Sequence, residues 1–128
     1  MNPSGNKTNS ADSIQILRRG DVAVIIPSPE IENMPEPFIE QAAELVLGPL
    51  RADPPNGIIV DFSRVGFVGS VFLSFLLRCH KIVKLRGSEM VLSGLTERTR
   101  ELLRVTALDT LWALYDTQAD ALEALGVN

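Results

Sequence analysis

The 128-residue sequence is poor in the residues that build metal sites and disulfides. It contains one cysteine, Cys79, and one histidine, His80. A single cysteine cannot form an internal disulfide. Two neighbouring residues on a helix point about 100° apart, so they can neither ligate one metal ion nor act as a nucleophilic pair. Glycine-rich phosphate-binding motifs are absent as well. We therefore expect no metal and no cofactor, and a buried, inert Cys79 thiol.

Long apolar runs and an excess of positive charge are also absent. No uninterrupted apolar stretch approaches the roughly 20 residues that a membrane helix needs, and the polar residues 1–12 lack the basic-then-apolar build of a signal peptide. The formal net charge is −4, whereas nucleic-acid binding requires a clustered excess of lysine and arginine. The sequence predicts a cytoplasmic chain that binds no nucleic acid and does not insert into a membrane.

The charges that are present are unevenly distributed along the chain. Seven of the twelve lysine and arginine residues lie within residues 78–104, and five glutamates lie within residues 30–44. This asymmetry fits ordinary solvated helix faces, and it also fits a face that docks a charged partner. Both interpretations stay open.

The most informative stretch of the sequence is residues 57–77. Residues 58–60 (Ile-Ile-Val) form a β-branched run closed by Asp61, which predicts a strand buried on both faces, since a one-sided strand would alternate apolar and polar residues. Serine and glycine then mark a loop, and from residue 71 the apolar spacing becomes helical. We expect Ser70 to be the N-cap of that helix. We expect Asp61 to organise the loop, because a catalytic acid would need an ionisable partner that the sequence does not identify. The sequence therefore does not predict an enzyme.

The rest of the chain alternates strands and helices. The predicted elements are a hairpin of strands at 13–17 and 22–26, a helix from about 38 to 50, strands at 90–92 and 111–115, a helix after Thr96 and a closing helix after Thr117. The proline-rich segment 27–37 is expected to be an extended, exposed connection. Right-handed crossovers make the later strands parallel. Residues 1–12 are predicted to be a disordered leader, and residues 13–128 a single domain.

The predicted strand, loop and helix resemble the STAS domain, the module of bacterial anti-sigma-factor antagonists and of sulfate-transporter tails. In that family a buried strand ends in Asp, and eight residues later Asp-Ser-Ser-Gly or a close variant opens a helix. The same spacing from Asp61 places Gly69 on the carboxylate of the motif and Ser70 on its first hydroxyl. It places Val71 on the residue that a partner kinase phosphorylates in that family.

The C-terminal part of the chain is also similar to that family. The run Ser-Gly-Leu-Thr-Glu at residues 93–97 is followed by Leu-Leu, by Ala-Leu-Asp-Thr-Leu and by a closing helix rich in alanine and leucine. The resemblance thus covers roughly residues 13–125. It implies a STAS-like α/β fold, with a mixed sheet of four or five strands and about four helices packed mainly on one face.

The resemblance implies a non-enzymatic interaction domain that acts as an anti-sigma-factor antagonist-like regulator in bacterial partner switching. Its partner would be a kinase-like anti-sigma factor or another STAS protein, and an oligomer is compatible with this reading. The residues predicted to contact the partner are Gly69, Ser70, Val71, Ser74 and Arg78. Since Val71 replaces the usual phosphoacceptor, Ser70 is the remaining candidate for phosphorylation.

Two other functions stay open at this point. One is a STAS-like subunit of a membrane transport complex that docks on an ATPase, and the other is a small-ligand carrier. Within the first interpretation the domain would be a constitutive binder, a structural subunit, or a switch moved to another serine.

Overall fold

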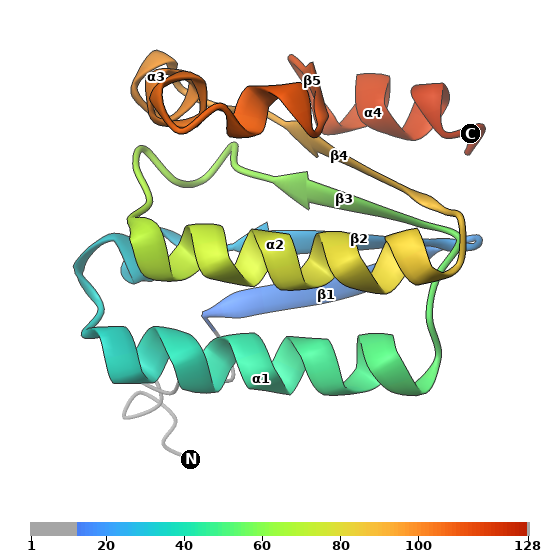
Figure 1. The fold of residues 1–128 in the computed structure, drawn as a ribbon, viewed down its shortest axis with the longest axis horizontal. Coiled ribbons are helices and arrows are strands. Elements are labelled where there is room, and N and C mark those ends of the chain that lie inside the picture. Colours follow the sequence, from blue (N-terminus) through green and yellow to red (C-terminus); the bar gives the residue numbers. More distant parts are fainter. Residues whose placement is uncertain (1–12, 128) are drawn as a thin grey trace.

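The fold is built on one five-stranded sheet, seen in a computed structural model that describes residues 13–127 (Figure 1). The predicted leader at residues 1–12 lies outside the described residues. The strands follow one another across the sheet in chain order, with β1 and β2 antiparallel and every later neighbouring pair parallel. Their bounds are Ile14–Arg19 for β1, Val22–Pro27 for β2, Gly57–Asp61 for β3, Glu89–Ser93 for β4 and Ala113–Tyr115 for β5.

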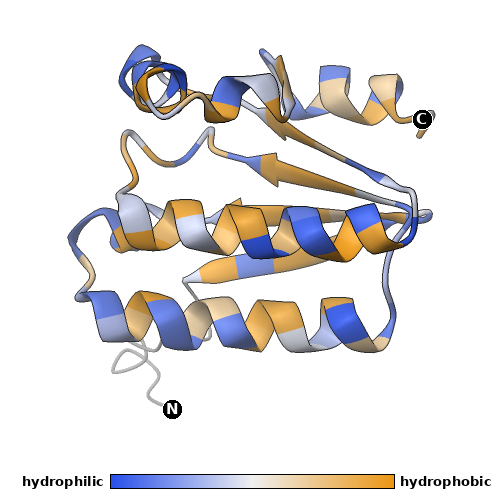
Figure 2. Cartoon of the chain, viewed as in Figure 1, coloured by the Kyte–Doolittle hydropathy of each residue, from blue (hydrophilic) through white to orange (hydrophobic). Residues whose placement is uncertain are grey.

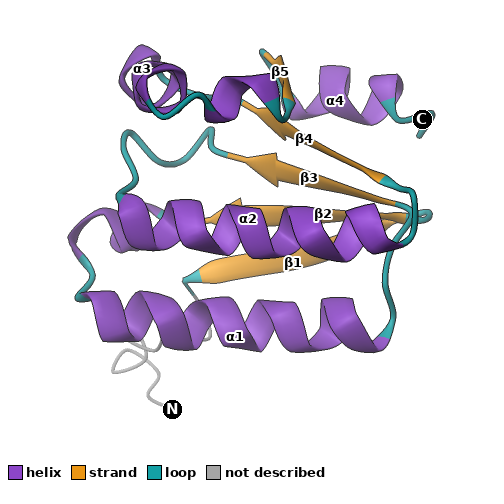
Figure 3. Cartoon of the chain, viewed as in Figure 1, coloured by secondary structure: helices purple, strands orange, loops and turns teal. Residues whose placement is uncertain are grey.

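Four α-helices cover the two faces of the sheet unequally. Helices α1 (Glu36–Ala52) and α2 (Ser70–Leu85) lie side by side across one face (Figures 1 and 3). Helix α3 (Glu97–Val105) places Leu103 in the same core, whereas α4 (Gln118–Ala124) packs on the opposite face. The predicted mixed sheet with about four helices packed mainly on one face is therefore confirmed.

Strand β3 is the centre of both cores, as its β-branched run predicts. Ile58 and Val60 point into the main core under α1 and α2, while Ile59 points into the smaller core under α4, and all three are fully buried. Figure 2 shows the central strands as almost continuously hydrophobic, whereas α1 and α2 carry mixed outer faces. A parallel strand that is buried on both faces has an unbroken apolar sequence.

The proline-rich connection differs from the prediction. It is not extended throughout, because residues Pro29–Asn33 form a 3₁₀ helix, η3. The hydroxyl of Ser28 caps this helix by accepting a hydrogen bond from the Glu30 amide at 3.2 Å. Ile31 is buried in the main core. Proline tolerates the first turn of a helix, so the capping serine and the buried isoleucine outweigh the extended tendency of the prolines.

The last strand also begins later than predicted. A second 3₁₀ helix, η4 (Leu108–Thr110), precedes β5, and the last strand starts at Ala113 rather than at residue 111.

Among residues 13–127, no helix is long and apolar enough to cross a membrane.

Candidate functional site

The candidate site is the loop of residues 62–69 and the first turns of α2, at the carboxyl end of β3. Asp61 organises the start of this loop, in agreement with the prediction. Its buried carboxylate accepts a hydrogen bond from the Ser63 amide at 2.9 Å and another from Gln118 Nε2 at 2.8 Å. The carboxylate thus joins the loop to the first turn of α4.

Gly66 fixes the middle of the loop through both of its backbone polar groups. Its amide donates to the Glu32 carboxylate at 2.7 Å. Its carbonyl accepts from Thr96 Oγ1 at 2.7 Å and from Thr99 Oγ1 at 3.4 Å. Residues from η3 and α3 therefore hold the loop from two sides, and the loop is shaped before any partner arrives.

An aromatic contact adds a third attachment next to Gly66. The guanidinium of Arg98, on α3, lies over the Phe67 ring with its carbon 4.2 Å from the ring centroid. A cation in this position is attracted by the negative face of the ring. The contact restrains the loop immediately before α2 begins.

Helix α2 starts at Ser70, as predicted, but Ser70 is not its N-cap. Gly69 occupies the cap position with extended backbone angles, and no side chain caps the helix. A capping hydroxyl must sit on the residue just outside the helix, and Ser70 already has a helical backbone. The first intrahelical bond joins the Leu73 amide to the Gly69 carbonyl at 3.1 Å. The amides of residues 70–72 consequently have no backbone acceptor among the described residues.

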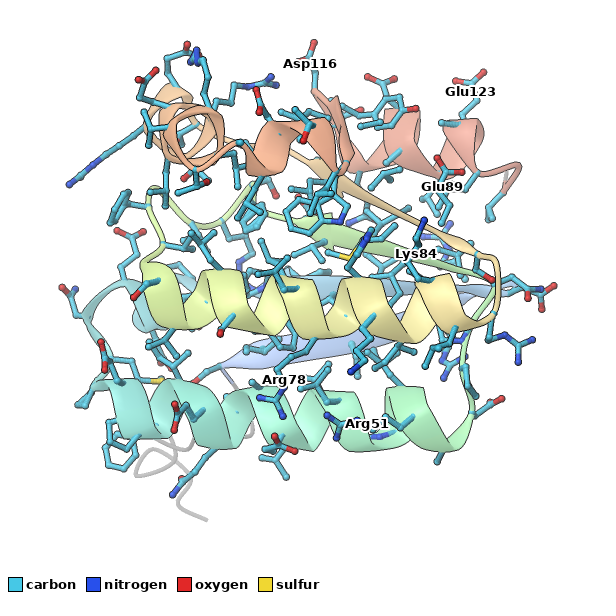
Figure 4. The ribbon with its side chains drawn as sticks, viewed as in Figure 1. Arg51, Arg78, Lys84, Glu89, Asp116 and Glu123 are labelled. Atoms are coloured by element: carbon cyan, nitrogen blue, oxygen red, sulfur yellow. The ribbon has the colours of Figure 1, made fainter. Side chains whose placement is uncertain are left out.

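The five predicted contact residues do not form one free surface. Gly69, Ser70 and Ser74 are exposed at the start of α2, and Val71 is half-buried against the main core. Arg78 extends into the space between α2 and α1 (Figure 4), where its guanidinium is bonded to the Glu44 carboxylate of α1. Four of the five residues thus lie together, while Arg78 links two helices.

The Arg78 link is a small charge cluster rather than a single pair. Arg51 also approaches Glu44, with its Nη1 3.5 Å from a carboxylate oxygen. The hydrogen bond from Arg78 lowers the pKa of Glu44, and the charge of Arg51 acts in the same direction. Glu44 is therefore ionised at neutral pH and holds both cations on the surface of α1.

Cys79 and His80 lie apart from the site and have separate environments. Cys79 is fully buried, and burial raises the pKa of its thiol to about 12. His80 Nδ1 accepts a hydrogen bond from Trp112 Nε1 at 3.0 Å. Burial and then the nearby Lys84 lower the pKa of His80. Within residues 13–127 no three His, Cys, Asp or Glu side chains gather to hold a metal ion.

Several residues that shape the site were missed by the sequence analysis. Thr96 was predicted only as a helix cap, and it does cap α3, accepting from the Thr99 amide at 3.2 Å. The roles of Glu32, Phe67 and Gln118 had no local signal, because their partners lie far away in the chain. Glu32, for example, bonds a glycine 34 residues downstream.

Comparison with known proteins agrees with the sequence resemblance. A family model for the STAS domain matches residues 13–121. The anti-sigma-F factor antagonist RsfB of Mycobacterium tuberculosis is 28% identical over 113 residues, which cover 86% of each chain.

Solved structures give the same result for the fold. An anti-sigma-factor antagonist (STAS) domain protein from Planctomyces limnophilus superposes with a TM-score of 0.78 at 28% identity, covering 88% of this chain and 97% of that one. An anti-sigma factor antagonist from Mycobacterium paratuberculosis has a TM-score of 0.68 at 31% identity, covering 88% of this chain and 92% of the other. Given the match along most of its length, the chain belongs to the STAS domain family.

Proposed function

We propose that this protein is an anti-sigma-factor antagonist-like regulator, which acts by binding a kinase-like anti-sigma factor and not by catalysing a reaction. The observation that carries the proposal is the shaped loop around Gly66, which leads into the exposed residues Gly69 and Ser70 at the start of α2. The relatives named as anti-sigma factor antagonists support it, since they match the chain across this region. A loop held before binding loses little conformational entropy on association.

The proposed contact surface consists of Gly69, Ser70, Val71 and Ser74, with Arg78 at its edge. Gly69 ends the loop, Ser70 and Val71 open α2, and Ser74 lies one turn further along the helix. Arg78 contributes indirectly, because its bond to Glu44 fixes α2 against α1. Its substitution would disturb the surface without removing a direct contact.

The expected behaviour of this surface is constitutive binding. Val71 has no hydroxyl, so the position of the family's phosphoacceptor cannot be modified. Ser70 is exposed at the first position of α2, and a phosphate there would meet the amides at the positive end of the helix. The fold could therefore accommodate the phosphate, but a kinase that selects position 71 would not deliver it.

The test combines partner binding with phosphate mapping. A kinase-like anti-sigma factor from the same organism would be incubated with ATP and either wild type, Ser70→Ala or Val71→Ser, and phosphate would be located by mass spectrometry. We expect wild type to bind the factor and to remain unmodified, and Val71→Ser to be phosphorylated at residue 71. Ser74→Ala is a control for phosphate mapping alone, because Ser74 is the other hydroxyl of the proposed contact surface.

Two results would contradict this proposal. Stoichiometric phosphate on Ser70 of the wild type would show a working switch instead of constitutive binding. Failure of the wild type to bind any kinase-like anti-sigma factor of its organism would remove the proposed function itself.

A further inference from the structure

A cavity of about 200 Å³ opens beside the proposed contact surface, between η3 and the start of α2. We call it the η3–α2 pocket. Ile39, Val68 and Phe72 provide apolar side chains to its lining, and each of them is buried. Phe67, Glu36 and Ser70 also line it. The pocket therefore combines an apolar interior with a polar, partly acidic border.

The size of the η3–α2 pocket indicates what it can hold. Sites for free metabolites and cofactors usually measure about 300–1,000 Å³, so this cavity is too small to enclose such a ligand. It is large enough for a single side chain of the size of leucine or methionine. A protruding residue of a partner protein fits it better than a free small molecule does.

The charged side chains that line the pocket are both acidic, although Arg98 lies over the ring of Phe67, another lining residue. Glu32 and Glu36 both line it, and none of the described lining residues is a lysine or arginine. The Glu32 carboxylate already accepts from the Gly66 amide. Glu36 is exposed and makes no ion pair with any residue in the described part of the chain. Glu36 is thus the carboxylate that is available to a positive charge on a partner.

The backbone at the pocket offers hydrogen-bond donors. Gly69, Ser70, Val71 and Phe72 all line it, and the amides of residues 70–72 lack backbone acceptors within the described chain. A peptide carbonyl can accept from such an amide at the open end of a helix. The apolar interior, the amides at the open end of the helix and the exposed Glu36 carboxylate together match the side chain, backbone and charge of a short peptide segment.

We propose that the η3–α2 pocket receives an apolar side chain of the partner protein, and that a basic residue next to it in the partner pairs with Glu36. The proposal rests on the proposed function, because it concerns the partner of the same surface. It assigns the partner a protruding segment in which an aliphatic residue and a lysine or arginine are neighbours.

A first experiment tests the pocket without the partner. The ¹⁵N-labelled protein would be titrated by NMR with N-acetyl-Leu-Arg-amide and with N-acetyl-Leu-Glu-amide, at the millimolar concentrations that such weak ligands require. We expect amide shifts concentrated at residues 31–34 and 67–72, with tighter binding of the Leu-Arg peptide. Glu36→Gln should abolish the preference between the two peptides, whereas Glu40→Gln should leave it unchanged. Absence of localised shifts, or equal shifts with both peptides, would overturn the proposal.

A second experiment uses the kinase-like anti-sigma factor. We expect Glu36→Lys to weaken its binding about tenfold or more, as reversal of a charge at an interface does, while Glu40→Lys leaves it within about twofold. Circular dichroism of both variants checks that α1 still forms. If wild type binds the factor and both variants bind equally well, the pocket assignment is wrong and the proposed function stands. If wild type does not bind, the proposed function fails, and the peptide titration still decides the pocket.

Discussion

At the scale of single residues, Gly94 shows two constraints acting at one position. Its φ of +72° lies in the left-handed region, and a Cβ added there would come 2.9 Å from the Ser63 amide nitrogen and 3.1 Å from Asp61 Oδ1. The backbone after β4 thus passes close against the loop that follows β3. Gly87 has nearly the same φ, +71°, but a Cβ there would meet no atom within 4 Å. A side chain at Gly87 would cause backbone strain alone, whereas a side chain at Gly94 would cause both backbone strain and steric crowding.

We predict that Gly94→Ala is clearly more destabilising than Gly87→Ala. Gly87→Ala should cost roughly 1–2 kcal/mol, the usual penalty for a left-handed residue with a Cβ. Gly94→Ala should cost a further 1–3 kcal/mol or so, because the methyl group overpacks the loop. Urea denaturation of the two variants and wild type measures both losses. Equal losses would mean that the approach of Gly94 to Asp61 does not constrain the loop.

Residue-scale predictions from sequence succeeded where the signal was local. The β-branched run before Asp61 predicts a strand that is buried on both faces. The helical spacing of the apolar residues around Cys79 predicts that the thiol is buried. The carboxylate of Asp61 was expected to organise the loop, and its bond to Ser63, two residues away, follows from that expectation. Its second partner, Gln118, is 57 residues distant, and no pattern in the sequence connects them.

At the scale of elements, the threonine caps of the two short C-terminal helices differ in one long-range hydrogen bond. Thr96 caps α3 and Thr117 caps α4, each hydroxyl accepting from the amide three residues ahead. Both caps were predicted from the sequence and both are confirmed. Thr96 Oγ1 also donates to the Gly66 carbonyl, which is 30 residues earlier in the chain. Thr96 therefore stabilises both a helix and the candidate site.

We predict that Thr96→Ala loses more stability than Thr117→Ala. Each variant loses a cap worth about 1 kcal/mol, and Thr96→Ala should lose another 0.5–1.5 kcal/mol or so with the bond to Gly66. Thr96→Ser keeps the hydroxyl and should recover most of the difference. Chemical denaturation gives the free energies of unfolding. Hydrogen exchange of the loop amides shows whether the bond between Thr96 and Gly66 holds the loop. Unchanged exchange in Thr96→Ala would show that the hydroxyl does not hold the loop.

Among the elements, the proline-rich connection after β2 departs most from its prediction. Prolines fix φ near a value that extended chain and 3₁₀ helix share, so they do not distinguish the two. Ile31 supplied a signal, since one apolar residue among charged and proline neighbours is costly to leave in water. Its burial turns η3 inward and brings Glu32 to the loop.

At the scale of the whole molecule, the parallel arrangement of β2, β3 and β4 explains why the site forms at one place. Carboxyl ends of neighbouring parallel strands lie at the same edge of a sheet, which is where α/β proteins usually bind their ligands. The segments after these three strands carry Glu32, Gly66 and Thr96, which meet in the loop. The order of elements predicted the parallel strands on which this convergence depends. The individual contacts depended on loop shapes that periodicity does not encode.

Stability of the whole molecule should depend on pH through its one histidine. In the folded state His80 accepts a hydrogen bond at Nδ1 from Trp112, which requires a neutral ring, and burial followed by the charge of Lys84 lowers its pKa below the ordinary 6.5. Above pH 6.5 His80 is neutral in both the folded and the unfolded state, so its contribution to the free energy of unfolding is fully present. As the pH falls below 6.5, the unfolded chain binds a proton first. The free energy of unfolding therefore decreases until the folded pKa is passed.

We predict that wild type is less stable at about pH 5.5 than at about pH 7.5, the interval in which an ordinary histidine titrates. The lowered pKa of Glu44 affects stability only below its ordinary value of 4.5, outside this interval. His80→Asn keeps an acceptor near Nδ1 but cannot titrate, so its stability should change much less between the two pH values. Trp112→Phe removes the donor and should reduce the dependence without abolishing it. Urea denaturation at both pH values tests the three proteins, and an equal decrease in wild type and His80→Asn would assign the pH dependence to other groups.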